Sequence, residues 1–411
     1  MRDMGRSDDP RVQAQLDRLS TLSIQRDTLG LDAIRELLRR LGDPHKRLPP
    51  TFHVAGTNGK GSTCAFLRAM LEAEGYSVHV TTSPHLVRYN ERFRVAGKLI
   101  EDARLAELLE QVFDAAEGLD CSFFEITIAA AFTEFARVPA DACVVEVGLG
   151  GRLDATNVLE PGVLAACGIA ALGIDHEKFL LAPEEGVPKE PMARIAFEKA
   201  GIAKKGVPLV TVPQPDIEMR SIQEAAIRSQ TTVVIAPPVQ QVPSSLSGAH
   251  QASNAGLASA MLKAQSRLQL SDAAIAMGLN KAHWPARLQR LRNGPLVEGR
   301  DVWLDGGHNA SAGEQIAAFF DGPLHLIIGM IEGKDPQAII GPLGDRIRTL
   351  TVVPVPNFPS HSAEAFGPQA TAAKDVEEAL LNLPSDDYPV LIAGSLYLAG
   401  EVLRLNDEIP D

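Results

Sequence analysis

The sequence predicts a protein of the α/β class with two domains, a larger one over residues 1–285 and a smaller one over residues 286–411. Two observations carry this prediction. First, 411 residues are more than one ordinary hydrophobic core supports. Second, short apolar runs alternate with helical patterns along most of the chain, which is typical of mostly parallel sheets covered by helices. The boundary is placed in HWPARLQRL, residues 283–291, where Pro285 ends the preceding helix.

The composition is that of a soluble globular protein, with 45% apolar and 22% charged residues. No run of about 18 apolar residues is present, so no membrane span is expected, and the amino terminus lacks the apolar core of a signal peptide. A net charge of −13 disfavours nucleic acid as a partner. The isolated cysteines predict reduced, buried thiols, as in a cytoplasmic protein; they are Cys64, Cys121, Cys143 and Cys167.

The first strong pattern is TFHVAGTNGKGST, residues 51–63. The apolar run TFHVA predicts a buried strand, and from Ser62 onward apolar residues recur every three to four positions, as in a helix. Glycines between a strand and a helix let the backbone approach an anion, amide groups at the helix start point at it, and Lys60 adds a positive charge. The pattern departs from the usual phosphate loop, because the first glycine would fall on Val54 and Gly61 precedes Ser62. We nevertheless expect this loop to bind phosphate.

Two further segments follow this loop. YSVHVTTSPHL predicts a strand and a turn at Ser83, where a serine has the ordinary role of a turn residue. SFFEITIAAAFTEF, residues 122–135, predicts a helix that begins with a capping box of Ser122 and Glu125. Capping accounts for both of these residues without any function.

A second strong pattern is ACVVEVGLGGRLDATN, residues 142–157. It predicts a buried strand and a glycine-rich turn, with Glu146 near the carboxyl end of the strand. A carboxylate in an apolar strand is destabilising unless it is paired or bound to a metal. Ligands of open α/β sheets gather at this end of the strands. We therefore interpret Glu146 as a magnesium ligand rather than a member of a structural ion pair.

The next apolar strand, VLAACGIAALGI, is expected to end in Asp175 and His176. Residues 180–193, rich in proline and glutamate, predict a lengthened surface loop. The helix ARIAFEKAGI follows this loop, carries Lys199 and ends at Gly201. Taken alone, a histidine at a strand end and a lysine on a helix are typical of solvent-exposed residues.

The rest of the chain continues the alternation of strands and helices. Residues 207–235 predict a strand, a helix and a strand, and GAHQASNAGLASAMLKA predicts a helix with small residues on one face. After the boundary, the apolar runs DVWLDG, PLHLIIGM, RTLTVVPV and YPVLIAGS predict the strands of a second α/β unit. Asp305 is expected at the end of the first of these strands.

Together these motifs resemble a known family. GTNGKGST is similar to the ATP loop of the Mur ligase superfamily and, within it, of the folylpolyglutamate synthase/dihydrofolate synthase family. SPHL, SFFE, EVGLGGRLDATN, EKAGI, ARLQ and DGGHN are similar to segments of that family, in the same order, so that the resemblance covers nearly the whole chain. It implies a larger domain of the P-loop ATPase type, with a mostly parallel sheet that serves ATP and a pterin. The smaller domain would be Rossmann-like and would complete the glutamate ligase.

The resemblance implies an ATP site with contributions from both domains. Asn254 would contact the adenine, Arg287 a phosphate and Asp305 the ribose. The residues of the phosphate loop that would contact ATP are Asn58, Gly59, Lys60, Gly61 and Ser62.

The resemblance also implies metal and substrate sites. Two magnesium ions would be held by Ser83, Glu146, His176 and, if it is carbamylated, Lys199. The pterin would lie against Ser122, Phe124, Asp154 and Ala155. Catalysis is expected to depend on Lys60, Glu146, His176 and Lys199.

The implied activity is ATP-dependent ligation of L-glutamate to dihydropteroate, to a folate or to both, through an acyl phosphate. We expect a cytoplasmic monomer that acts on small molecules, with no nucleic acid or membrane partner. Two alternatives stay open. A Mur-type ligase of peptidoglycan precursors would share the ATP loop, whereas a non-catalytic nucleotide-binding regulator would not need Glu146, His176 and Lys199 together.

Overall fold

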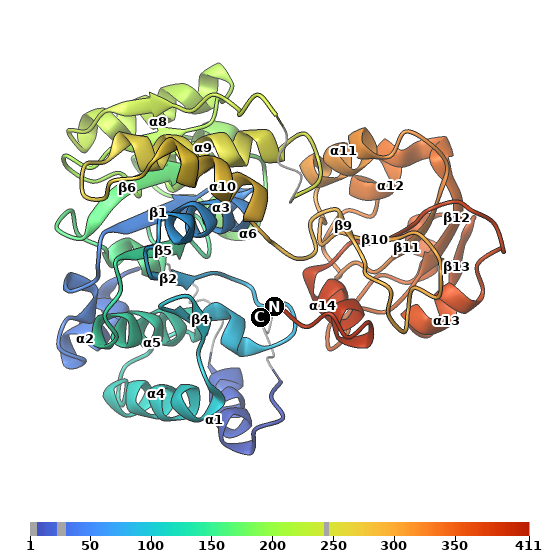
Figure 1. The fold of residues 1–411 in the computed structure, drawn as a ribbon, viewed down its shortest axis with the longest axis horizontal. Coiled ribbons are helices and arrows are strands. Elements are labelled where there is room, and N and C mark those ends of the chain that lie inside the picture. The colour runs from blue at the N-terminus through green and yellow to red at the C-terminus, as the bar shows by residue number, and fades with distance from the viewer. Residues whose placement is uncertain (1–5, 23–29, 242–245, 411) are drawn as a thin grey trace. The chain divides into compact units, whose positions relative to one another are not determined.

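The computed structural model describes residues 6–22, 30–241 and 246–410, which divide into two compact units (Figure 1). The larger unit holds the described residues up to 241 together with 251–283, and the smaller unit holds 246–250 and 284–410. The division at residue 284 lies beside the expected boundary. Residues 246–250 belong to the smaller unit although they precede a helix of the larger one, so the chain passes between the units more than once.

The larger unit is built on an eight-stranded sheet with the order β4-β3-β2-β5-β1-β6-β7-β8. All neighbouring strands are parallel except the short β3 and β4, which form an antiparallel edge. The strands are β1 (Thr51–Ala55), β2 (Val78–Thr81), β3 (Arg94–Val95), β4 (Lys98–Leu99), β5 (Ala142–Glu146), β6 (Leu164–Ile169), β7 (Leu209–Thr211) and β8 (Val233–Ile235). The central strands are buried from end to end, as apolar runs of a sheet covered on both faces should be.

Helices cover both faces of this sheet (Figure 1). α3 (Lys60–Ala73), α9 (Gln251–Ala264) and α10 (Asp272–Lys281) pack together on one face. α5 (Phe123–Arg137) lies on the other face, with α2 (Asp32–Arg40) and α4 (Asp102–Ala115) against it and α1 (Pro10–Thr21) outside α4. The remaining helices of the unit are α6 (Glu177–Leu180), α7 (Pro191–Ala200) and α8 (Asp216–Arg228), with short 3₁₀ turns η1 (Pro44–Lys46), η2 (Tyr89–Arg92) and η3 (Ala155–Val158).

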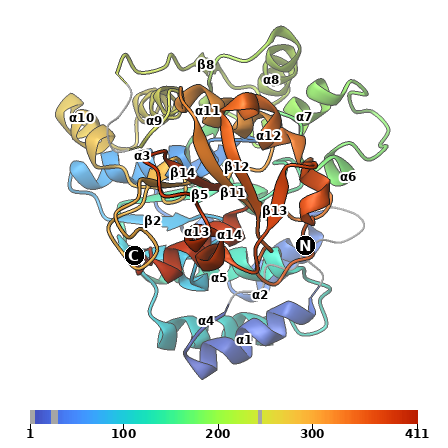
Figure 2. The same ribbon diagram turned by 90° about the vertical axis from the view of Figure 1, so that its right-hand side faces the viewer.

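The smaller unit is a second, six-stranded sheet with the order β13-β12-β11-β14-β10-β9 (Figure 2). Only β9 (Gln289–Arg290) is antiparallel to its neighbour. The other strands are β10 (Val302–Leu304), β11 (Leu324–Ile328), β12 (Ile347–Val352), β13 (Ala370–Ala372) and β14 (Val390–Ala393). The helices are α11 (Ala310–Phe319), α12 (Gln337–Leu343), α13 (Val376–Leu381) and α14 (Leu396–Leu405), with short 3₁₀ turns η4 (Gly344–Arg346) and η5 (Ala363–Phe366).

The structure confirms the predicted fold class and corrects one strand boundary. β6 ends at Ile169, so the strand does not continue to Asp175 and His176 as expected. Beyond this strand, the carbonyl of Ala171 accepts hydrogen bonds from the backbone of the phosphate loop. The four cysteines are buried thiols, as predicted. Among the described residues, no helix is both long and apolar enough to cross a membrane.

Candidate active site

The carboxyl end of β1 lies where the connections of the larger sheet diverge. β1 has β5 on one side and β6 on the other, and all three strands are parallel. The chain leaves β1 towards β2 on the β5 side, and it leaves β6 towards β7 on the opposite side. Loops that diverge in this way open a crevice at the carboxyl edge of a parallel sheet. The phosphate loop, Glu146 and the loop after β6 all follow strands at this edge.

The phosphate loop has the backbone shape that its glycines predict. Gly59 has a φ of +85° and immediately precedes α3, so the first amide groups of the helix face the loop. A Cβ atom at Gly59 would lie 2.2 Å from Oδ1 of Asn254 on α9, so any side chain here would require the buried Asn254 to move. Lys60 is half-buried, and its Nζ donates to the carbonyl of Thr57 at 3.2 Å. The helix begins at Lys60, two residues before the expected Ser62.

The loop is anchored to the segment that follows β6. The hydroxyl of Thr57 donates to the carbonyl of Gly173 at 2.8 Å, and the amides of Thr57 and Asn58 donate to the carbonyl of Ala171 at 2.9 and 3.2 Å. The amide of Asn58 is therefore engaged within the protein. A phosphate group would depend on the amides that follow it, at the start of α3, and on Lys60.

Lys199 is buried beside the phosphate loop rather than solvated. It lies on α7, and its Nζ donates to the carbonyl of Gly56 at 2.9 Å. Burial, with a smaller contribution from the charge of Lys60, lowers the pKa of Lys199 to about 7. A buried ammonium group is destabilised by desolvation and by a nearby like charge. The neutral amine is therefore accessible near neutral pH.

Glu146 ends β5 at the same edge and is buried, with 5% of its surface exposed. Its Oε2 accepts a hydrogen bond at 3.0 Å from the backbone amide of Ser83, in the turn that contains a cis Ser83-Pro84 peptide. The structure thus places the backbone of Ser83 beside the Glu146 carboxylate, two residues that the sequence analysis named as magnesium ligands.

His176 has a different setting from the one expected. It precedes α6 with a φ of +54°, and 42% of its side chain is exposed. Its Nε2 lies 3.8 Å from Oδ2 of Asp175. In the described part of the chain, no three His, Cys, Asp or Glu side chains gather as a metal-binding group. His176 and Glu146 are therefore not joined in such a cluster.

The segment assigned to the pterin packs against the glycine loop after β5. Ser122 caps α5, and its hydroxyl and amide bond to Oε2 of Glu125 at 2.8 Å, so the predicted capping box is present. The ring of Phe124 covers Gly148, where an added Cβ would lie 2.4 Å from the ring. Only glycine permits this approach of backbone and ring.

Asp154 is turned into its own loop. The carboxylate is buried and accepts bonds from the amide of Leu149 at 2.8 Å, from the amide of Thr156 at 3.0 Å and from the hydroxyl of Thr156. Burial raises the pKa of Asp154, and these hydrogen bonds oppose the rise. The carboxylate holds residues 148–156 in shape, and the adjacent Ala155 is also buried.

A partly buried network of ion pairs, not foreseen from the sequence, fixes this loop to α7. Arg152 donates to Glu198 at 2.9 Å and to Glu184 at 2.6 Å, and Arg194 reaches the same two carboxylates at 3.0 and 2.8 Å. Glu184 lies in the loop expected over residues 180–193, and it joins this network although 41% of its side chain is exposed. Arg194 and Glu198 are four positions apart on α7, whereas Arg152 is 46 positions from Glu198, so no local pattern links Arg152 to the network.

The other residues assigned to ATP lie in two different units. Asn254 is buried on α9 of the larger unit, where its Nδ2 donates to Gln251 at 2.9 Å. In the smaller unit, Asp305 follows β10 and accepts from the amides of Leu288 and Gly307 at 2.8 and 2.7 Å. Arg287 belongs to the turn that Asp305 holds.

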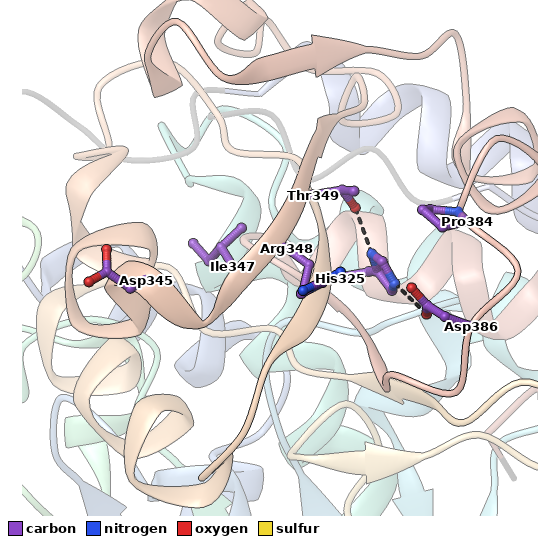
Figure 3. A pocket seen from close by; sticks show the side chains of 7 residues that line it. All are labelled: His325, Asp345, Ile347, Arg348, Thr349, Pro384 and Asp386. Carbon is purple, nitrogen blue, oxygen red and sulfur yellow. Dashed lines mark hydrogen bonds and ion pairs between the residues drawn. The ribbon is translucent and has the colours of Figure 1, made fainter.

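A hollow of about 350 Å³ lies elsewhere in the smaller unit (Figure 3). His325 is at its centre, with Nδ1 2.8 Å from the hydroxyl of Thr349 and Nε2 2.8 Å from Oδ1 of Asp386. These residues lie at the amino-terminal ends of β11 and β12, opposite to the end of β10 where Asp305 lies. The polar groups of the hollow bond to each other, and these hydrogen bonds tie the loop before β14 to the sheet.

Comparison with known proteins decides the family. Although no family model matches the chain, it is 33% identical to the dihydrofolate synthase/folylpolyglutamate synthase of Bacillus subtilis, over 91% of this chain and 94% of that protein. The chain belongs to the folylpolyglutamate synthase/dihydrofolate synthase family. This membership agrees with the order of the sequence motifs and with the two α/β units.

Solved structures of this family have the same fold. Folylpolyglutamate synthase of Mycobacterium tuberculosis, complexed with ADP, superposes with a TM-score of 0.85 at 26% identity and covers 98% of this chain and 99% of its own. The bifunctional folylpolyglutamate synthase/dihydrofolate synthase of Yersinia pestis, complexed with AMPPNP and a manganese ion, gives 0.81 at 29% identity and covers 96% and 97%. Enzymes of this family are ATP-dependent ligases that join glutamate to folates.

Proposed function

We propose that this protein ligates L-glutamate to the carboxylate of dihydropteroate, of a folate or of both, with ATP as the phosphoryl donor. The observation that supports it best is the arrangement at the carboxyl edge of the larger sheet. There the phosphate loop, the Lys199 amine and the pair of Ser83 and Glu146 follow neighbouring strands or contact their loops. A regulator that only binds a nucleotide does not need these groups together.

The chemistry begins with an unreactive carboxylate. Its oxygen attacks the γ-phosphorus of ATP, ADP leaves, and an acyl phosphate results. The amine of glutamate then attacks the acyl carbon and loses a proton, and phosphate leaves with the carboxylate oxygen. We assign to Lys60 and the amides of Gly61 and Ser62 the stabilisation of the transferring phosphoryl group.

The residues fit a divalent cation of the magnesium type. Magnesium prefers oxygen ligands, and it commonly takes only one or two carboxylates from the protein and completes its shell with phosphates and water. We assign Glu146 and the hydroxyl of Ser83 as such oxygen ligands, so the lack of a larger acidic cluster in the described residues does not argue against the ion. When bound, the ion neutralises charge on the phosphates. We propose His176 and a carbamylated Lys199 as ligands of a second ion.

Carbamylation of Lys199 is chemically accessible at this position. The neutral amine adds to the carbon of carbon dioxide and releases one proton, which gives an anionic carbamate with two oxygens. The pKa of about 7 leaves a substantial neutral fraction near neutral pH. Carbamylation would also replace a cation beside Lys60 with an anion.

We assign the pterin to the surface formed by Ser122, Phe124 and the Asp154-Ala155 segment. We assign ATP to the phosphate loop and Asn254, and to Arg287 and Asp305 of the smaller unit. Since the carboxylate of Asp154 is used within its loop, we expect the backbone of that loop, rather than the carboxylate, to face the substrate. We further propose a cytoplasmic monomer without nucleic acid or membrane partners.

Product analysis tests the proposal directly. The protein is incubated with ATP, magnesium and glutamate together with dihydropteroate or with tetrahydrofolate, and the products are identified by mass spectrometry. We expect one added glutamate residue on at least one pterin and one ADP released for each. Lys60→Ala should abolish turnover but keep the fold, because Lys60 contributes only half-buried surface. Glutamate-independent ATP hydrolysis, or ligation only to a peptidoglycan precursor, would overturn the proposal.

A further inference from the structure

A buried hydrogen-bonded chain connects the strand before the phosphate loop with the loop after β5. His53 is the third residue of β1 and is completely buried. Its Nε2 lies 2.8 Å from Oγ1 of Thr156, which is 103 positions away in sequence. The hydroxyl of Thr156 bonds in turn to Oδ1 of Asp154. Neither His53 nor Thr156 has a role in the proposed chemistry.

The hydrogen-bond partners indicate which atoms of this hydrogen-bonded chain carry protons. Thr156 has one hydroxyl proton, which it donates to the Asp154 carboxylate. With Asp154 ionised and accepting that proton, we infer that Nε2 of His53 carries a proton and donates it to Thr156. Among the described residues, Nδ1 of His53 has no hydrogen-bond partner, and a proton placed on it would be a buried donor without an acceptor. Burial lowers the pKa of His53 to about 3, so the ring stays neutral.

Asp154, at the other end of the hydrogen-bonded chain from His53, controls the loop that carries the proposed pterin contacts. Oδ2 of Asp154 accepts the amide of Leu149 at 2.8 Å, while Oδ1 accepts the amide and hydroxyl of Thr156. Leu149 follows Gly148, on which the ring of Phe124 rests. A rotation of the Asp154 carboxylate would therefore move the backbone beneath Phe124.

We propose that His53 is a positioning residue, which fixes the Asp154 loop for the pterin through its Nε2–H donor to Thr156. The inference rests on the proposed function, because it concerns the pterin side of the site. ATP binding should depend on it little, since the phosphate loop has its own anchors at Gly173 and Ala171. An imidazole that only filled space in the sheet would have no such selective effect.

Paired substitutions separate a donor from a space-filling group. His53→Gln keeps an N–H donor near the position of Nε2, whereas His53→Met has a similar length and no donor. Thr156→Ser and Thr156→Val form the same pair at the next residue. His79 supplies a matched control, because it is a buried strand histidine whose Nε2 and Nδ1 bond only to the backbone, at Val138 and Ala96.

We expect a split between the two substrates in steady-state kinetics. His53→Met and Thr156→Val should raise the KM for the pterin about tenfold, which is the effect of losing one ordinary hydrogen bond. The KM for ATP should change less than about twofold, and His53→Gln and Thr156→Ser should stay near the wild type. His79→Met should leave the pterin KM unchanged. A wild-type pterin KM in His53→Met, or equal increases for ATP and pterin, would overturn the proposal.

A spectroscopic measurement tests the proton assignment without any turnover. In protein labelled with ¹⁵N-histidine, the signal absent from His53→Gln belongs to His53, and it should show a neutral ring protonated at Nε2 from pH 5.5 to pH 9. Thr156→Val should shift this signal. A ring protonated at Nδ1 would overturn the proposal even if His53→Met failed to fold. If the wild type did not ligate glutamate to either pterin, the proposed function would fail, and the tautomer would still be measured.

Discussion

Replacement of Lys199 by methionine should make the protein more stable at neutral pH, and this gain should vanish as the pH rises. Lys199 is 5% exposed and has a pKa of about 7 instead of the usual 10.5. Between these values the unfolded chain binds the proton and the folded chain does not, so the free energy of unfolding increases with pH. Methionine fills a similar volume and carries no charge, which removes this dependence.

The size of the expected change in the free energy of unfolding can be worked out from the structure. The fall of the Lys199 pKa from 10.5 to about 7 corresponds to about 5 kcal/mol of lost stability below pH 7. Methionine also removes the hydrogen bond to the carbonyl of Gly56, which costs about 1–3 kcal/mol. We therefore expect Lys199→Met to be about 2 kcal/mol more stable than the wild type at pH 6.5 and about equal to it at pH 9.

The assay is urea unfolding at pH 6.5, 8 and 9 in buffers free of metal ions and carbon dioxide. Trp284 and Trp303 both lie in the smaller unit, so tryptophan fluorescence follows that unit, while circular dichroism follows the whole chain. The fluorescence transition should not respond to the substitution. Parallel curves for variant and wild type across this pH range would refute the reasoning, because they would show that Lys199 keeps its proton equilibrium on folding.

Three further outcomes follow from the site. Glu146→Gln should lower turnover about a hundredfold or more and leave the urea midpoint unchanged, because the amide keeps the size but not the charge of a metal ligand. Full activity of this variant in the presence of magnesium would exclude Glu146 as a ligand. Gly148→Ala should cost about 1–3 kcal/mol and raise the pterin KM, because the new methyl group would lie 2.4 Å from the ring of Phe124; an unaltered melting temperature would contradict this packing. Glu198→Gln should lower the free energy of unfolding by about 3 kcal/mol, because it leaves two arginines without a buried carboxylate. Glu184→Gln should lower it by at most about 1 kcal/mol, because 41% of that side chain is exposed. Equal losses of stability in thermal unfolding would show that burial does not decide the strength of these pairs.

Local patterns were sufficient for most of the fold. TFHVA and ACVVEV are apolar runs short enough to be strands, and both form the buried centre of the larger sheet. The capping box at Ser122 and the helix up to Gly201 depend on residues that are neighbours in sequence, so they could be predicted without tertiary information. The short strands β3, β4, β9 and β13 carry no such pattern and were missed.

The residues of the candidate site were likewise predicted where the pattern lies in neighbouring residues and not where it depends on distant ones. Glycines on either side of Lys60 predicted a phosphate loop, and a carboxylate in an apolar strand made Glu146 a candidate ligand. His176 was expected at a strand end, but β6 ends at Ile169 and His176 lies in the segment between that strand and α6. The length of β6 depends on its pairing with β1 and β7, which are distant in sequence.

By itself the sequence determined the two α/β units, the glycine-rich loops and the order of the motifs, because each depends on residues within a few positions. Only the tertiary structure decided that Lys199 is buried against Gly56, 143 positions away, and that Asp154 points into its own loop. It also decided that His53 lies within hydrogen-bond distance of Thr156. Burial and long-range hydrogen bonds set the protonation of these groups, and neither is encoded in the type of a residue or of its neighbours in sequence.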